Sequence, residues 1–354
     1  MTTQSDTPDL ATLIARAEAG DINAAARASM ELDRAGKHQQ AFQYLARAAK
    51  GGHLTAQVAL GLRLMTGHAA PLDPDQGMLL ISQAANAGSG DALAYMASIV
   101  TSGLIGEPNW EAAFVALLRG AERKSASALA QLNVLDIAGM TSVRALQDFA
   151  NAPRPRTVSE TPHIATLEGL LPRAFCDHWI VRTKPKLSAA RVHDAEQGGR
   201  RVDAMRTNTG AGFRLSDTDL IMQMTRNRIA SAIGQPIRHQ EPANVLHYAV
   251  GQTYEPHYDF LDPDNANFAT LVSKQGQRVA TALVYLNDGF DGGETNFVEL
   301  KRKIRGRPGE LLTFNNVKPD GSIDPQTLHE GTAPTRGEKW LLSIWVRDRA
   351  LPAI

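Results

Sequence analysis

The sequence contains almost no cysteine, with Cys176 alone among 354 residues. One cysteine cannot form a disulfide within the chain, and a long chain without cysteine pairs is typical of a reducing compartment. The first ten residues, MTTQSDTPDL, lack the basic start and the apolar stretch of a secretory signal peptide. No apolar run approaches the roughly 20 residues that a membrane helix needs. These absences predict a cytoplasmic protein without membrane association.

An excess of charge of either sign is also missing. Lys+Arg and Asp+Glu number 37 each, so no overall field would attract nucleic acid or an anionic membrane. Hydrophobic residues make up 43% of the chain and charged residues 21%, which fits a soluble globular protein and excludes a disordered one. A length of 354 residues exceeds one typical domain, so two separate cores are expected.

Residues 10–150 repeat themselves at an offset of 36 residues. The aligned apolar positions recur at i, i+3 and i+7, which is the spacing of one helix face. Each unit is therefore expected to be a pair of short antiparallel helices whose first member ends at an aligned glycine. The first unit is irregular, because the equivalent Ala24 and Ala56 are 32 residues apart. The aligned residues include Gly67, Gly103 and Gly139 at the helix ends, and Phe42, Met78 and Phe114 in the second helices.

Within this region, the stretches LARAAKGGH and ISQAANAGSGD resemble the unit ends of Sel-one-like repeats, a branch of the tetratricopeptide class. The resemblance covers about residues 15–140 and implies an all-α helical-repeat solenoid. Such solenoids commonly present a concave face to a peptide or protein. The repeats would therefore bind a protein substrate or partner, or they would only cap the domain that follows. The sequence leaves both roles open.

The second half of the chain has a different character. Residues 151–162, NAPRPRTVSETP, carry three prolines and break the helical pattern, so a linker is expected there. Across residues 163–350, two amphipathic helices are expected near RAFCDHWIVRT and DTDLIMQMTRNRIASAIG. The other apolar segments are short β-rich runs, such as RVATALVYLN and KWLLSIWVRD, separated by turn residues. Many short strands with few helices predict a sandwich or barrel.

The stretch YEPHYDF places His257 and Asp259 two positions apart. Alternate residues of a strand point to the same side, so an imidazole and a carboxylate would project together. Such a pair is common on protein surfaces, but His329, in QTLHEGTAPTRGEKW, offers a third ligand. Two histidines and one carboxylate leave three positions open on an octahedral ion, the arrangement of non-haem Fe(II) oxygenases.

Lys339 strengthens this interpretation. It follows His329 by ten residues, with APTRG as a turn between them. We therefore expect His329 to end one strand and Lys339 to start the neighbouring strand. A buried ammonium needs an anion, and the distal carboxylate of 2-oxoglutarate is a suitable one. Tyr254 and Thr281 would donate hydroxyl hydrogen bonds to the same carboxylate, or they would simply fill the barrel.

Residues from about 164 to 348 resemble the prolyl 4-hydroxylase branch of the Fe(II)/2-oxoglutarate dioxygenases. The sequence departs from the family near MRTNTGAGF, where Asn208 takes the place of the serine in an Arg-Thr-Ser segment. The matching stretches, in the family's order, are HYAVGQTYEPHYDF, GQRVATALVYLND, FDGGETNF, RGRPGELLTF and LHEGTAPTRGEKWLLSIWVRD.

This resemblance implies that residues 163–350 form an α+β double-stranded β-helix, or jelly roll. The implied reaction consumes O2 and 2-oxoglutarate, releases succinate and CO2, and inserts one oxygen atom into an unactivated C–H bond, for example of a peptidyl proline. Ascorbate is a further expected cofactor. The implied residues are His257, Asp259 and His329 as Fe(II) ligands, Lys339, Tyr254 and Thr281 around 2-oxoglutarate, and Trp345 and Arg278 at a substrate pocket. Trp345 could instead be core, and Arg278 a charge at a strand end.

Two other functions remain open on the sequence alone. The chain could be a repeat-based adaptor with a weakly active or sensing barrel, although a decayed barrel would be expected to lose one of its candidate ligands. It could also be a zinc hydrolase that uses the same three ligands, but that function would leave Lys339 without a purpose.

Overall fold

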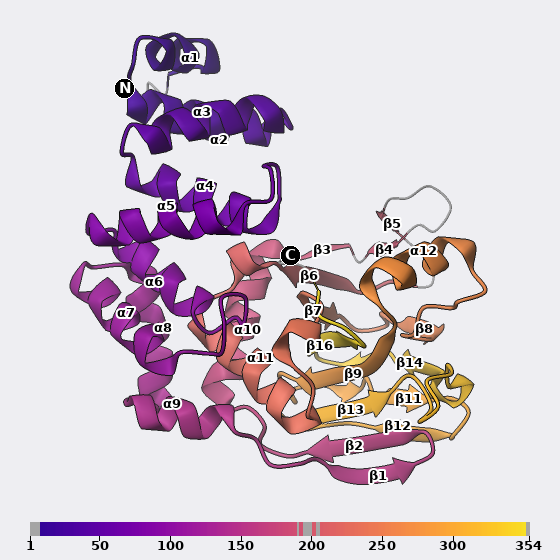
Figure 1. The fold of residues 1–354 in the computed structure, drawn as a ribbon. Helices are drawn as coiled ribbons and strands as arrows, with labels where there is room; N and C mark the ends of the chain where they lie inside the picture. Colours follow the sequence, from indigo (N-terminus) through magenta and orange to yellow (C-terminus); the bar gives the residue numbers. More distant parts are fainter. Residues whose placement is uncertain (1–7, 190, 194–199, 203–205, 352–354) are drawn as a thin grey trace, which may run out of the picture. The chain divides into compact units, whose positions relative to one another are not determined.

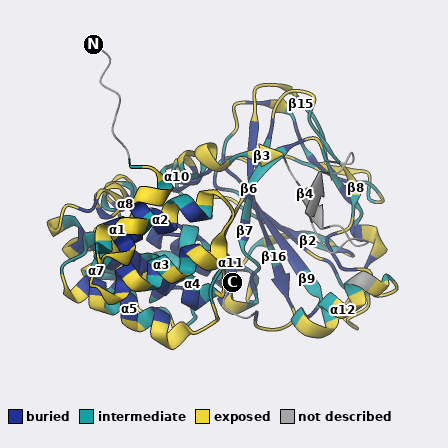
Figure 2. Cartoon of the chain, turned by 90° about the horizontal axis from the view of Figure 1, so that it is seen from above, coloured by how far each residue is buried: buried dark blue, intermediate teal, exposed yellow. Residues whose placement is uncertain are grey.

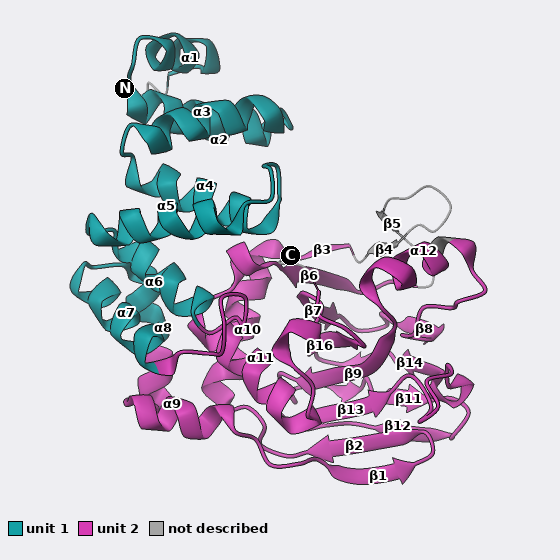
Figure 3. Cartoon of the chain, viewed as in Figure 1, with its two compact units in different colours: residues 1–100, 111–132, 353–354 teal, residues 101–110, 133–352 magenta. Residues whose placement is uncertain are grey.

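The computed structural model describes residues 8–189, 191–193, 200–202 and 206–351 (Figure 1). The described chain divides into two compact units (Figure 3). Residues 8–100 and 111–132 belong to the first unit, and residues 101–110 and 133–351 belong to the second. None of the described helices has the length and apolar character of a transmembrane span.

The N-terminal region consists of helix pairs, as the 36-residue repeat predicted. The aligned Gly67, Gly103 and Gly139 all have left-handed backbone conformations, with φ of 66°, 78° and 71°, which glycine adopts without strain. The helices are α1 (Leu10–Glu18), α2 (Ile22–Arg34), α3 (His38–Lys50), α4 (Leu54–Thr66), α5 (Pro74–Asn86), α6 (Gly90–Ile99), α7 (Trp110–Glu122), α8 (Ala126–Ile137) and α9 (Val143–Ala150).

The irregular first spacing has a simple structural origin. The connection from α2 to α3 spans residues 35–37, whereas the connection from α4 to α5 spans residues 67–73. The second connection is four residues longer (7 − 3 = 4), which is the difference between the two repeat spacings. The helices themselves keep their lengths, so the irregularity is confined to a loop.

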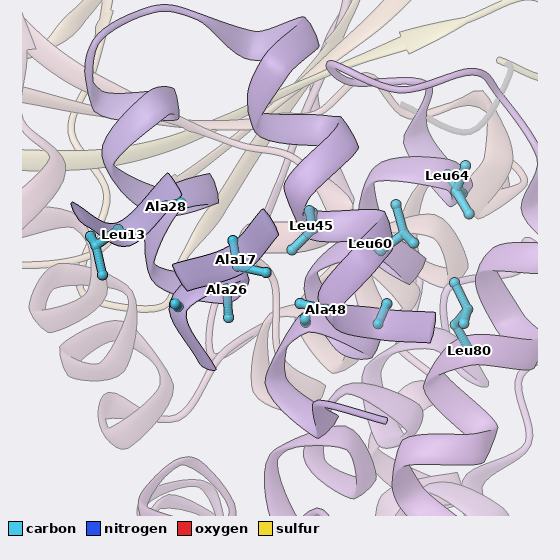
Figure 4. Close-up of a cluster of buried hydrophobic side chains, with 13 residues drawn as sticks. Leu13, Ala17, Ala26, Ala28, Leu45, Ala48, Leu60, Leu64 and Leu80 are labelled. Atoms are coloured by element: carbon cyan, nitrogen blue, oxygen red, sulfur yellow. The ribbon is translucent and has the colours of Figure 1, made fainter. Parts of the chain in front are cut away.

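Small residues allow the helices of the first unit to approach closely. Ala17, Ala28 and Ala48 are completely buried in a cluster that Leu45, Leu60 and their neighbours fill (Figure 4). Between α4 and α5 the approach is closer still: a Cβ atom at Gly61 would lie 2.7 Å from the carbonyl oxygen of Gly77. Only glycine fits such a contact, so the pairing of these two helices depends on that residue type.

The second unit contains a large and a small antiparallel sheet. The large sheet has the order β1-β2-β13-β9-β16-β7-β6-β3, and the small sheet has the order β12-β11-β14-β8. The large sheet comprises β1 (Arg156–Glu160), β2 (His163–Leu167), β3 (Ser188–Ala189), β6 (Thr209–Phe213), β7 (Ala243–Tyr248), β9 (Arg278–Tyr285), β13 (Leu311–Asn315) and β16 (Lys339–Arg347). The small sheet comprises β8 (Tyr254–His257), β11 (Thr295–Phe297), β12 (Arg302–Ile304) and β14 (His329–Gly331). Two-stranded pairs are β4 (Arg191–His193) with β5 (Arg200–Val202), and β10 (Asp291–Gly292) with β15 (Pro334–Arg336).

Both faces of the large sheet are covered. The small sheet contributes Phe297, whose ring meets that of Phe314 edge-on with centroids 5.1 Å apart. On the other side, Trp179 of α10 (Arg173–Thr183) meets Phe213 of β6 at 5.2 Å. The central strand β16 is therefore buried over almost its whole length (Figure 2). This two-sheet arrangement, with α10 and α11 (Leu220–Ile233) where the sequence predicted helices, confirms the expected α+β jelly roll.

The expected linker at residues 151–162 is partly structured. Residues 156–160 form β1, which pairs with β2 at the edge of the large sheet. The prolines flank this strand, and an edge strand tolerates nearby proline because one side makes no ladder hydrogen bonds. Residues 133–150 also belong to the second unit, where Arg228 of α11 lies 4.3 Å over the ring of Phe149 in α9.

Two local predictions were wrong. The stretch FLDPDNANFATLVSKQG after Asp259, which the sequence predicts to be a loop at the substrate entrance, contains α12 (Ala266–Gln275), whose first turn is fixed where the Ala269 N–H donates to the carbonyl of Asn265. His329 does not end a strand beside that of Lys339; it starts β14 in the small sheet, while Lys339 starts β16 in the large sheet. The APTRG segment between them contains β15 as well as a turn, so it carries the chain from one sheet to the other.

Candidate metal centre and co-substrate pocket

Pairing of β8 with β14 brings the candidate metal ligands together. His329 lies directly opposite His257 in this antiparallel pair, and Asp259 follows two residues after the end of β8. One ligand atom from each of the three side chains lies within 4.8 Å of the others. The Nε2 atoms of His257 and His329 are 3.7 Å and 3.5 Å from the Asp259 carboxylate oxygens. This is the convergence that the sequence predicted.

Both imidazoles are oriented by main-chain carbonyls. Nδ1 of His257 is 2.8 Å from the carbonyl of Glu255, and Nδ1 of His329 is 2.9 Å from the carbonyl of Thr327. When Nδ1–H donates to a carbonyl, Nε2 keeps the lone pair that a metal requires. Burial, together with the neighbouring His329, lowers the pKa of His257 to about 3, so its ring is neutral and competent to bind a metal at neutral pH.

One cavity includes these three side chains in its wall, together with Lys339. Lys339 is fully buried, and its Nζ atom has no hydrogen-bond partner among the residues that the structure describes. Nζ lies 5.1 Å and 5.6 Å from the ring centroids of Tyr248 and Tyr285. Burial lowers the pKa of Lys339 to about 7. A desolvated ammonium is costly unless an anion accompanies it, so the cavity is shaped for an anionic ligand beside a metal.

Two hydroxyl-bearing residues of the cavity were missed in the sequence. Tyr248 lies opposite Lys339 in the β7–β16 pair, and Thr295 begins β11 with its hydroxyl 3.0 Å from that of Tyr285. Both line the cavity and are 2% exposed. The available signal was weak: Tyr248 alternates with Leu246 on one face of a predicted strand, and only the register with β16 reveals Lys339 as its neighbour.

Thr281, predicted beside 2-oxoglutarate, makes its hydrogen bonds to other side chains. Its hydroxyl donates to Asp259 Oδ2 at 2.7 Å and accepts from Asn316 Nδ2 at 3.0 Å. Thr281 is absent from the cavity wall, and its hydroxyl is already committed on both sides. In the structure Thr281 is therefore a partner of Asp259, and its role at 2-oxoglutarate stays a prediction.

Arg278 also lies behind the cavity wall rather than in it. Its guanidinium makes two hydrogen bonds to Glu241, at 2.6 Å and 2.9 Å, and lies 3.8 Å over the ring of Trp345. The ion pair fixes the cation, and the cation in turn supports the indole. Trp345 itself lines the cavity, and its Nε1 atom has no hydrogen-bond partner in the described part of the chain. Arg278 is thus a support for Trp345, whose contact with substrate stays a prediction.

Tyr254 is the remaining predicted residue, and it lies in the cavity wall. Its ring stacks on the imidazole of His257, with centroids 3.5 Å apart and an angle of 15° between the planes. The guanidinium of Arg206 lies 4.3 Å from the same tyrosine ring. Tyr254 therefore steadies a candidate metal ligand; that it also binds 2-oxoglutarate stays a prediction.

Comparisons with known proteins agree with this site. The model of the 2OG-Fe(II) oxygenase superfamily matches residues 243–347, which include all three candidate ligands and Lys339. Prolyl 4-hydroxylase 5 of Arabidopsis thaliana is 34% identical over 208 residues, covering 53% of this chain and 69% of that protein.

Solved structures similar to this chain fall into two groups. A viral collagen prolyl hydroxylase from Paramecium Bursaria Chlorella virus-1 is 25% identical, with a TM-score of 0.40, and covers 54% of this chain and 98% of its own. A Sel1 repeat protein from Oxalobacter formigenes is 22% identical, with a TM-score of 0.32, and covers 37% of this chain and 57% of its own.

The match to Prolyl 4-hydroxylase 5 spans 69% of that protein at 34% identity. Within the described residues, a fully buried ammonium without a hydrogen-bond partner shares one cavity with two histidines and a carboxylate, which is what Fe(II) and 2-oxoglutarate together require. The chain belongs to the prolyl 4-hydroxylase branch of the 2OG-Fe(II) oxygenases and is a 2-oxoglutarate-dependent dioxygenase with an N-terminal helical-repeat region.

Proposed function

We propose that this protein hydroxylates a proline within a peptide or protein, with His257, Asp259 and His329 as the Fe(II) ligands. One observation carries the site assignment: the three side chains share a cavity with Lys339, whose buried ammonium has no partner in the described chain. The substrate class is supported by the relatives, which are prolyl 4-hydroxylases.

The residues of the chain would divide the work as follows. Bound Fe(II), O2 and 2-oxoglutarate supply the oxidising chemistry, and 2-oxoglutarate is consumed to succinate and CO2. Lys339 holds the distal carboxylate of 2-oxoglutarate by charge, and the hydroxyls of Tyr248 and Thr295 are in the same cavity to donate hydrogen bonds to it. The rings of Tyr254 and Trp345 offer aromatic surface to the apolar ring of a proline.

The remaining proposals concern partners and location. We propose that the helix pairs of residues 10–150 bind the protein substrate or a partner, because stacked helix pairs expose extended surfaces to other chains. The single cysteine, which is typical of a reducing compartment, supports a cytoplasmic location. Ascorbate is proposed as the reductant that keeps the iron ferrous.

Anaerobic addition of Fe(II) and 2-oxoglutarate tests the site. We expect an absorption band near about 500 nm, typical of a 2-oxo acid chelating Fe(II) at a two-histidine, one-carboxylate site. Admission of O2 with a proline-containing peptide should then yield succinate and a peptide heavier by one oxygen atom. The same peptide with alanine in place of proline is the control. A well-folded protein that gives no band contradicts the iron site, and oxygen on a residue other than proline contradicts the substrate.

The affinity for 2-oxoglutarate should fall as the pH rises above 7. The Lys339 pKa of about 7 means that the free protein loses this proton just above neutrality, and binding of a dianion must then restore it. Between this pKa and its raised value in the complex, the affinity should fall by up to about tenfold per pH unit. Calorimetric titrations in buffers of different ionisation enthalpy should show proton uptake at pH 8. A Lys339→Met variant should show none.

A further inference from the structure

Three buried polar side chains form a row that ends on the candidate metal ligand Asp259. Asn316 Nδ2 donates to the Thr281 hydroxyl at 3.0 Å, and that hydroxyl donates to Asp259 Oδ2 at 2.7 Å. Thr281 and Asn316 are 0% exposed, and Asp259 is 4% exposed. Polar groups buried to this degree are tolerated only when their hydrogen bonds are made, so the row is a defined part of the interior.

The row gives the Thr281 hydroxyl a direction. Because Asn316 Nδ2 can only donate, the Thr281 oxygen accepts from it, and the single hydroxyl hydrogen is available for the carboxylate. The other acceptor near this hydrogen, Asn316 Oδ1, is at 3.5 Å and competes poorly with Asp259 Oδ2 at 2.7 Å. The hydrogen bond engages Oδ2 and not Oδ1, so it fixes the rotation of the carboxylate about its axis.

Asn316 is itself held by the main chain. Its N–H donates to the carbonyl of Val279 at 2.9 Å, and its carbonyl accepts from the N–H of Asp324 at 3.1 Å. The second bond closes residues 316–324 into a loop. The next turn is held where the N–H of Thr327 donates to the carbonyl of Asp324 at 3.1 Å, and the carbonyl of Thr327 orients His329 at 2.9 Å. One segment therefore contacts the metal site at both ends, through a side chain toward Asp259 and through a carbonyl toward His329.

We propose that Asn316 is a positioning residue of the metal centre, acting on Asp259 through Thr281. The inference rests on the proposed function for the iron ligands and deepens it. Partners that orient a ligating carboxylate typically change metal affinity by about 10- to 100-fold when they are removed. The row should therefore set how tightly the centre holds its ion, in addition to how fast it turns over.

Metal titration of the full-length protein tests this proposal without relying on turnover. Mn(II) binding to the native protein and to Thr281→Val, Asn316→Ala and the double variant should be measured by calorimetry. We expect Thr281→Val to raise the Kd by about 10- to 100-fold. Asn316→Ala should have a smaller effect, and the double variant should be no weaker than Thr281→Val, because Asn316 acts only through the threonine. Thr281→Ser keeps the hydroxyl and should restore native affinity.

Thr225→Val is the matched control. Thr225 is also 0% exposed, accepts from Trp179 Nε1 at 3.1 Å and donates to the carbonyl of Ile221 at 3.0 Å, but within α11 and away from the cavity wall. It should lower the melting temperature and leave the Mn(II) affinity unchanged. The positioning role would be overturned if Thr281→Val bound Mn(II) with native affinity, or if the two single variants lost affinity equally and their losses added in the double variant. Either result, with Mn(II) still bound by the native protein, would leave the iron site intact. If the native protein bound no divalent ion, the proposed function itself would be overturned, and the positioning role of Asn316 with it.

Discussion

Replacement of His329 by alanine is expected to give a folded protein that neither binds Fe(II) nor converts 2-oxoglutarate to succinate. His329 is 4% exposed and lies opposite His257 across β8 and β14. Its replacement removes one of the three candidate ligands, and an exposed side chain could not take its buried position. Two remaining ligands hold a ferrous ion weakly and leave the co-substrate without a fixed geometry. Metal content after dialysis against Fe(II), and succinate release, are the measurements.

A second histidine serves as the control for this experiment. His163 lies in β2 of the same unit and is outside the cavity wall, so His163→Ala should retain both metal and turnover. Circular dichroism and the melting temperature should confirm that His329→Ala is folded. Retention of one equivalent of Fe(II) by His329→Ala would show that the metal binds at another site.

Replacement of Lys339 by methionine should make the ligand-free protein more stable and the enzyme nearly inactive at ordinary 2-oxoglutarate concentrations. The free protein buries an ammonium without a partner in the described chain, and removal of such a group should raise the free energy of unfolding by about 1 to 3 kcal/mol. The bound dianion would lose its cation, so KM for 2-oxoglutarate should rise on the order of 100-fold.

The free energy of unfolding should therefore rise while the apparent affinity for 2-oxoglutarate falls, and urea unfolding of the free protein together with initial-rate kinetics will measure both. The pH adds a further check. The folded pKa of Lys339 is about 7 against an ordinary value of 10.5, so between these values the unfolded chain binds more protons. The lysine therefore contributes a stability that rises with pH across this window, and the methionine variant should lack that slope. A less stable variant with unchanged KM would show that Lys339 is an ordinary core residue.

Much of the fold could be predicted from periodicity and turn residues. The glycine register of the repeats, the helices near Arg173 and Leu220, and the principal strands of the large sheet all follow from local patterns. The strand β1 and the helix α12 could not be predicted, because proline-rich and Asp/Asn-rich surroundings mask their own short patterns. The assignment of His329 and Lys339 to different sheets depends on long-range pairing, which adjacent sequence cannot reveal.

Some residues of the candidate site could likewise be predicted from the sequence, and others could not. Residue types and family order predicted His257, Asp259, His329 and Lys339, because each has a chemical role that few residue types fill. The roles of Thr281 and Arg278 stay predictions, since threonine and arginine serve many purposes and the sequence did not reveal their contacts with Asp259 and Glu241. Tyr248, Thr295 and Asn316 were missed for the related reason that their neighbours come from distant strands.

The placement of the metal ligands and the ammonium on opposing sheets has a consequence for molecular selectivity. His257 and His329 belong to the small sheet, and Lys339 belongs to the large one, while the Phe297–Phe314 contact locks the spacing between them. The separation between the two histidines and the ammonium therefore selects for the length of the acid that binds both. We therefore expect a 2-oxo diacid with one methylene fewer to bridge the metal ion and the Lys339 ammonium less well than 2-oxoglutarate does.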